Sequence, residues 1–79
     1  MRLCNAYVEM GHNTLPEMVV TNKNFKGWKV RYYRTANNEI LKEYISHGES
    51  VDFDFFNKDD NYQLMMGMLQ SDEWELCQN

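Results

Sequence analysis

The chain has 79 residues, of which 25% are charged and 43% hydrophobic, and its formal net charge is −4. This length allows one domain, residues 1–79, with a single small core, and it excludes a second domain. No apolar run is long enough to span a bilayer, and the first residues lack the apolar region of a signal peptide. We therefore expect a cytoplasmic protein.

Charge is distributed unevenly along the chain. Residues 1–38 contain six basic and two acidic residues, whereas residues 39–79 contain two basic and ten acidic residues. This asymmetry predicts a bipolar molecule that steers charged partners, although it does not determine the fold.

Alternating side chains predict three strands in the first half of the chain. In residues 2–10 we assign one alternating set to the core: Cys4, Ala6, Val8 and Met10. A second, short strand is predicted at residues 17–21, after a turn and a proline. Residues 28–33 alternate between apolar and mostly basic side chains, which predicts a half-buried strand with an inward set of Trp28, Val30 and Tyr32.

The next reversal is predicted at two asparagines. Asparagine tolerates the positive φ that hairpin turns require, so we expect a two-residue turn at Asn37-Asn38. The returning strand is residues 40–46. Neither of its faces is purely apolar, and we assign Leu41 and Ile45 to the buried face.

A third strand is predicted at residues 51–55, after a turn with positive φ at Gly48. In this segment three apolar side chains alternate with Asp52 and Asp54, which is the clearest period-two pattern in the chain.

After Phe56 the pattern changes to that of a helix, which we place at about residues 58–70. The helical spacing i, i+3, i+4, i+7 is formed by Tyr62, Met65, Met66 and Leu69. Asn57 is the expected N-cap, and Asp59 and Asp60 fall in the first turn, where the helix dipole favours negative charge. We expect Gly67 to allow another backbone to approach closely.

The apolar arc of this helix is wider than one sheet face requires. Two elements are candidates to cover the remainder: the C-terminal segment, as a short strand or ordered tail anchored by Trp74, or a second subunit. The predicted fold is α+β, with a mainly antiparallel sheet of four to five strands and this one helix packed on one face.

Motifs for catalysis or metal binding are missing from the sequence. His12 and His47 fall in predicted turns, and neither belongs to a nucleophile motif. Cys4 and Cys77 do not combine with them in a spacing that suits zinc. We expect a protein that is not an enzyme, with no metal and no cofactor. The two thiols are expected to be free, the alternative being a disulfide between adjacent terminal strands.

An acidic set is the first candidate binding surface. Carboxylates at alternate strand positions lie about 7 Å apart, which is similar to the spacing of successive phosphates. Such a surface suits a basic protein partner and mimics a nucleic acid, although the same acids also serve solubility. The predicted partner-binding residues are Glu49, Asp52, Asp54, Asp59 and Asp60.

A basic and aromatic set is the alternative. Sheets that bind single-stranded nucleic acid combine cations for the phosphates with rings for base stacking. Internal pairing with the C-terminal acids would also account for these cations. The candidate nucleic-acid-binding residues are Lys29, Arg31, Tyr33 and Arg34.

The functional prediction is a small, non-enzymatic protein-binding module that acts as an inhibitor or regulator of a basic, nucleic-acid-binding protein. In size and charge the chain resembles the compact antagonists that phages make against host machinery. A small nucleic-acid-binding domain is the second hypothesis. We expect no membrane partner, and the methionine-rich helix is a candidate homodimer interface.

Overall fold

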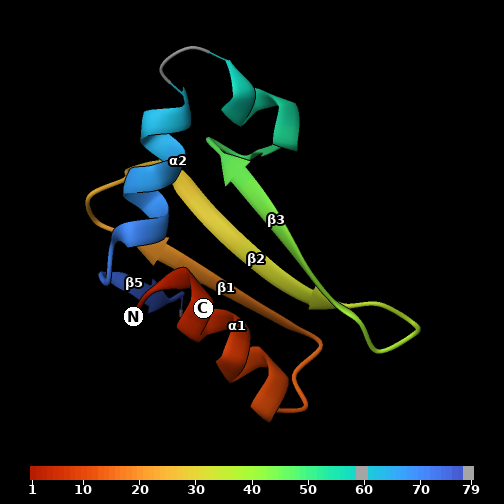
Figure 1. Cartoon of the computed structure of the whole chain (residues 1–79). Coiled ribbons are helices and arrows are strands. Elements are labelled where there is room, and N and C mark those ends of the chain that lie inside the picture. Colours follow the sequence, from red (N-terminus) through yellow and green to blue (C-terminus); the bar gives the residue numbers. More distant parts are fainter. Residues whose placement is uncertain (59–60, 78–79) are drawn as a thin grey trace.

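The computed structural model describes residues 1–58 and 61–77. Five antiparallel strands form one sheet in the order β4-β3-β2-β1-β5, and two α-helices lie on one side of it (Figure 1). The α+β prediction is confirmed, with a second helix added. The elements are α1 (Leu3–His12), β1 (Glu17–Asn22), β2 (Trp28–Arg34), β3 (Ile40–Ser46), β4 (Glu49–Val51), the 3-10 helix η1 (Phe53–Asn57), α2 (Asn61–Gln70) and β5 (Trp74–Leu76).

The core lies between the helices and one face of the sheet. The apolar faces of both layers meet there, and burying them removes apolar surface from water. No described helix is long and apolar enough to cross a membrane. The buried side chains are Leu3, Ala6, Met10, Met18, Val20, Trp28, Val30, Tyr32, Phe56, Met68 and Trp74.

The N-terminal segment is a helix, and the strand predicted at residues 2–10 is wrong. Leu3, Ala6 and Met10 are buried with the spacing i, i+3, i+7, whereas Cys4 and Val8 are exposed. Ala6 and Met10 fit both periods, because positions four apart share a face in a helix and in a strand.

The predicted strands β1 and β2 are confirmed, and β3 is confirmed with its faces reversed. A two-residue turn would pair Val30 with Ile45, but the observed partner of Val30 is Tyr44. The loop has three residues, closed by a bond from the Thr35 N–H to the Glu39 carbonyl (2.9 Å), with Asn38 at φ 64°. The extra loop residue shifts the register by one, which turns every side chain of β3 to the other face.

The strand predicted at residues 51–55 is also wrong beyond its first residue. β4 ends at Val51, after the predicted turn with positive φ at Gly48. The Asp52 carboxylate then accepts a hydrogen bond from the Phe55 N–H (3.3 Å), which caps η1. Phe56 is buried against Tyr44, with ring centroids 5.0 Å apart.

Helix α2 begins at Asn61, and the residue predicted as its N-cap, Asn57, instead ends η1. The predicted first-turn residues Asp59 and Asp60 lie outside the described residues. The C-terminal segment forms β5 beside β1, and Trp74 donates from its indole nitrogen to the Met68 carbonyl (2.9 Å). Trp74, in the C-terminal segment that was one of the two candidates, is therefore buried against α2.

Both cysteines are free, so the disulfide alternative does not apply. Cys4 is exposed on α1, and Cys77 is half-buried after β5.

Replacing Gly67 with alanine is expected to stabilise the protein by about 0.5–1 kcal/mol, because glycine in a helix interior costs about that much relative to alanine. The close neighbour of Gly67 is the Phe25 ring rather than a backbone, and an added Cβ would lie 3.6 Å from it, in ordinary contact. Urea unfolding measures the change.

The matched change is Gly27→Ala, which should destabilise the protein. Gly27 has φ 85°, and an added Cβ would overlap the His47 ring. A loss of stability in Gly67→Ala would contradict the described packing of α2.

Candidate protein-binding site

We call residues 49–54 the acidic loop. It comprises the edge strand β4, the cap residue Asp52 and the first two residues of η1. Its carboxylates belong to Glu49, Asp52 and Asp54, and all three residues are exposed. Asp54 lies in the first turn of η1, whereas one carboxylate oxygen of Asp52 accepts the hydrogen bond that caps that turn.

Phe53 lies between the two aspartates and is 70% exposed. The two following phenylalanines show why the chain presents this ring outward. Phe56 is buried, and Phe55 packs on Trp28 with ring centroids 5.8 Å apart, so η1 is anchored to the core by these rings. Phe53 is therefore exposed at the start of a turn whose two later phenylalanines pack on the core.

A groove of about 380 Å³ adjoins the acidic loop. Both apolar and charged groups line it, which suits a protein partner better than a wholly apolar ligand. Its lining residues are Tyr33, Lys42, Glu43, Tyr44, Ser50, Val51, Asp52 and Phe53.

The carboxylates of the acidic loop form no ion pair within the described residues. Within residues 1–58 and 61–77, ion pairs form between Lys23 and Glu73 and between Arg31 and two glutamates, and none reaches the loop. The loop thus presents three exposed carboxylates without ion pairs around an exposed aromatic ring, with Lys42 across the groove.

The predicted acidic set is only partly brought together. Glu49, Asp52 and Asp54 share the loop, but Asp52 and Asp54 do not lie at alternate positions of one strand. The phosphate-like spacing on which nucleic-acid mimicry was based is therefore missing from these residues. Asp59 and Asp60 fall outside the described part of the chain.

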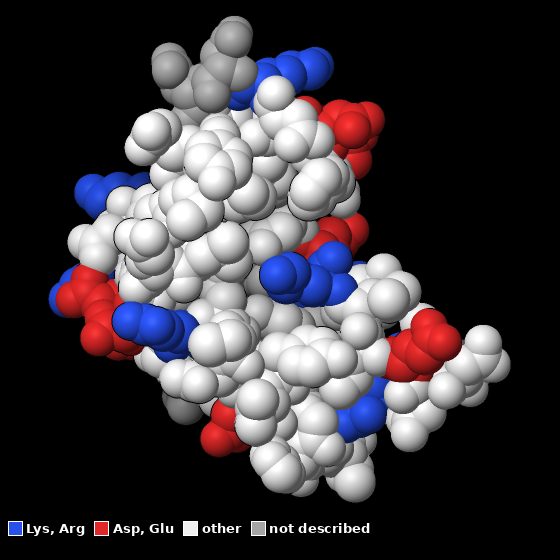
Figure 2. Space-filling model, in the orientation of Figure 1, with Lys and Arg blue, Asp and Glu red and all other residues white. Residues whose placement is uncertain are grey.

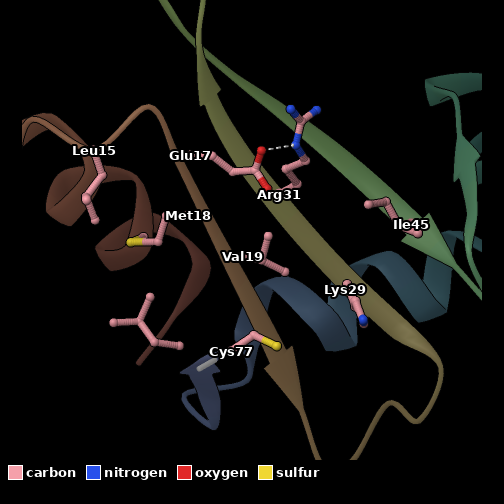
Figure 3. A pocket seen from close by; sticks show the side chains of 9 residues that line it. Leu15, Glu17, Met18, Val19, Lys29, Arg31, Ile45 and Cys77 are labelled. Carbon is pink, nitrogen blue, oxygen red and sulfur yellow. Dashed lines mark ion pairs between the residues drawn. The ribbon is translucent and has the colours of Figure 1, made fainter. Parts of the chain in front are cut away.

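The basic and aromatic set is largely paired within the chain. Arg31 on the helix-free face of the sheet binds Glu17 (3.0 Å) and Glu43 (3.4 Å), and its guanidinium lies 4.4 Å from the Tyr33 ring centroid. Figure 3 shows the Arg31–Glu17 ion pair at the pocket on this face. The hydrogen bond with Glu17 is the main reason that the pKa of Arg31 is raised. This pairing opposes phosphate binding by Arg31.

Arg34 forms hydrogen bonds with the protein backbone. Its guanidinium donates to the carbonyls of Met10, Asn13 (2.6 Å) and Leu15 (3.1 Å), where α1 ends and the chain turns towards β1. Lys29 is exposed and makes no ion pair within the described residues. Of the four candidate residues, Lys29 alone therefore offers a cation that is free for phosphate.

In the described part of the chain, no cluster of three histidine, cysteine or acidic side chains is placed to hold a metal. Burial raises the pKa of the Tyr32 hydroxyl above its ordinary value, and this hydroxyl donates to the Leu3 carbonyl (2.8 Å) inside the core. Tyr32 therefore joins α1 to the sheet.

Sequence reasoning missed Phe53, which it assigned to one face of a strand. The overlooked signal is Asp52, because aspartate is a common cap of helical turns. Its carboxylate accepts a hydrogen bond from the Phe55 N–H, and this bond ends the strand.

Comparison of this chain with protein-family models, with curated proteins and with solved structures finds no match.

Proposed function

We propose that this protein is a non-enzymatic protein-binding module that engages a basic partner through the acidic loop. The observation that supports the proposal is Phe53, 70% exposed and flanked by two exposed carboxylates. Aromatic residues that fill a partner's pocket commonly supply most of an interface's affinity. The surrounding charges select the partner and accelerate association.

The partner therefore has an apolar pocket edged by lysine or arginine. By occupying that pocket, the module acts as an inhibitor or regulator of its partner. The charges of the loop are unpaired in the described structure, so binding releases no internal ion pair. The anchored turn also limits the conformational entropy that binding costs.

The test is retention of protein from nuclease-treated cell lysate by the immobilised chain, followed by affinity measurement with the retained partner. Phe53→Ser should weaken binding by roughly 30-fold or more, the effect of truncating an aromatic anchor. Asp52→Asn with Asp54→Asn removes both charges but keeps an oxygen that caps η1. This double variant should weaken binding by roughly tenfold and reduce its salt dependence.

The matched control is Glu9→Gln with Glu75→Gln. It changes the net charge by the same amount at two exposed positions, on α1 and on β5 at the opposite edge of the sheet. This control should bind like the natural chain. Equal retention by all variants, or retention that is lost with nuclease, would contradict the proposal.

A further inference from the structure

The first part of β3 has no strand beside it on its outer side. β4 pairs with β3 only at residues 44–46, so the rest of β3 lies at the edge of the sheet (Figure 1). If the register of this pair continued, Phe53 would lie opposite Lys42. The chain instead leaves the sheet at Asp52, whose carboxylate caps η1. The cap therefore leaves the outer side of residues 40–43 open, and we call this stretch the open edge.

The main-chain groups of Ile40 and Lys42 point out from the open edge. In an antiparallel ladder, successive residues of a strand direct their N–H and carbonyl groups to opposite sides in turn. The His47 N–H donates to the Gly27 carbonyl (2.7 Å), so the odd-numbered residues of β3 bond to β2 and the even-numbered ones face outward. Within residues 1–58 and 61–77, the outward groups of Ile40 and Lys42 have no hydrogen-bond partner.

The groove beside the acidic loop lies at the open edge. Its lining includes Lys42 and Glu43 of β3, which point to opposite faces of the sheet, and Val51 and Phe53, where β4 ends and η1 begins. Figure 2 shows acidic side chains along the side of the molecule where β3 forms the edge, with basic side chains among them. The groove therefore combines free main-chain groups with side chains from both faces of the sheet.

We propose that the open edge receives an extended segment of the basic partner, which adds to the sheet as a further strand in line with β4. The proposal rests on the function proposed for the acidic loop and names how the partner is held. The outward groups of Ile40 and Lys42 repeat about every 7 Å, as in any strand. In strand addition the main-chain hydrogen bonds supply affinity, and contacts to alternate side chains supply specificity.

The chemistry of the open edge selects a polypeptide from another protein. Alternating N–H and carbonyl groups match an extended main chain, whereas phosphates only accept hydrogen bonds. Two copies paired antiparallel about Lys42 would set the two ammonium groups opposite one another, and like charges in that position destabilise a pair. A register shifted by two residues would set Glu43 opposite Glu39, with the same effect.

Charge also defines the segment. The residue opposite Lys42 is uncharged or acidic, because a basic one would repel the ammonium group. Lysine or arginine follows where the segment passes the exposed carboxylates of the acidic loop.

Amide hydrogen exchange of the pure protein tests the open edge itself. The N–H groups of Ile40 and Lys42 should exchange faster than those of Leu41 and Glu43, which bond to β2. Equal or slower exchange at Ile40 and Lys42 would overturn the proposal.

Strand addition is tested with a phage-displayed library of random eight-residue peptides, selected on the natural chain. The selected peptides should protect the amides of Ile40 and Lys42 from exchange. Lys42→Pro should weaken their binding about tenfold, because it removes one outward donor and leaves the bonds to β2 in place. Lys42→Ala keeps the N–H and should bind like the natural chain, which separates the main chain from the side chain.

Leu76→Pro is the matched control at the opposite edge of the sheet. The Cys77 N–H donates to the Val19 carbonyl of β1 (2.8 Å), so the N–H of Leu76 faces outward from β5. This variant should bind the peptides like the natural chain, and urea unfolding verifies that both proline variants fold. If Lys42→Pro unfolds, an ester in place of the Lys42 amide, made by peptide ligation, removes the same donor without a ring.

Two kinds of result would reject strand addition. Peptides that bind Lys42→Pro as tightly as the natural chain, or a selection that yields no peptide, would overturn it. Protection of the Lys42 amide that rises with the concentration of the pure protein would assign the open edge to a second copy instead. These measurements use no captured partner, so a failure of the Phe53→Ser test alone would reject the acidic loop and not the open edge.

Discussion

Replacing Trp74 with alanine is expected to destabilise the protein by about 3–5 kcal/mol, the usual range for a buried tryptophan. The side chain is 1% exposed and stacks on Phe25, with ring centroids 6.1 Å apart. Its indole N–H satisfies the Met68 carbonyl near the C-terminal end of α2. A domain of this length has a total stability of only about 4–12 kcal/mol, so the variant should lose between about a quarter and all of it.

The Trp74→Phe variant separates packing from hydrogen bonding. Phenylalanine keeps a ring against Phe25 but leaves the Met68 carbonyl without its indole donor, which should cost about 1–3 kcal/mol. Urea unfolding followed by circular dichroism measures both variants. A loss below about 1 kcal/mol in Trp74→Ala would show that Trp74 does not join α2 and β5 to the core.

Replacing Arg34 with alanine is expected to cost about 2–3 kcal/mol, because hydrogen bonds from a charged donor are the stronger ones. The guanidinium satisfies carbonyls of Met10, Asn13 and Leu15, and it places positive charge at the C-terminal end of the α1 dipole. Arg34→Lys should recover only part of the loss, since a single ammonium cannot reproduce the planar fork of donors.

Lys29→Ala is the control for Arg34, and it also compares the two functional hypotheses. Lys29 is exposed and unpaired within the described residues, so its loss should change stability by less than about 0.5 kcal/mol. The contrary result would be that Arg34→Ala has the same free energy of unfolding as the natural chain, while both variants weaken binding to single-stranded nucleic acid. That result would favour the nucleic-acid hypothesis over binding of a protein by the acidic loop.

Most of the sheet could be predicted from alternation along the chain. β1, β2 and β3 were located correctly because each has a period-two pattern bounded by turn residues. The face of β3 could not be predicted in this way, because it depends on one residue of loop length. Asn38 takes the positive φ that allows a three-residue loop, and this sets Tyr44 rather than Ile45 opposite Val30.

The alternating pattern predicted a strand wrongly at two places. Residues 51–55 alternate like a strand, but the Asp52 carboxylate bonds the Phe55 N–H and starts a helical turn instead. Residues 2–10 also alternate, yet Leu3 joins Ala6 and Met10 on the buried side of a helix. Period alone does not separate these states in short segments.

The acidic character of residues 49–54 can be read directly from the sequence, and the structure exposes the carboxylates of Glu49, Asp52 and Asp54. Phe53 was not identified, because an aromatic residue in a predicted strand is expected to be buried. Its exposure depends on η1, where Phe55 and Phe56 take the places against the core.

The most direct test of the acidic loop as a binding site is photo-crosslinking from position 53. A photoreactive phenylalanine analogue at Phe53 should form a covalent adduct with one basic protein in nuclease-treated lysate. The same analogue at Leu76, which is also exposed but lies in β5 at the far edge of the sheet, should give no such adduct. No adduct at position 53, or the same adduct from both positions, would contradict the assignment of the acidic loop as the partner-binding surface.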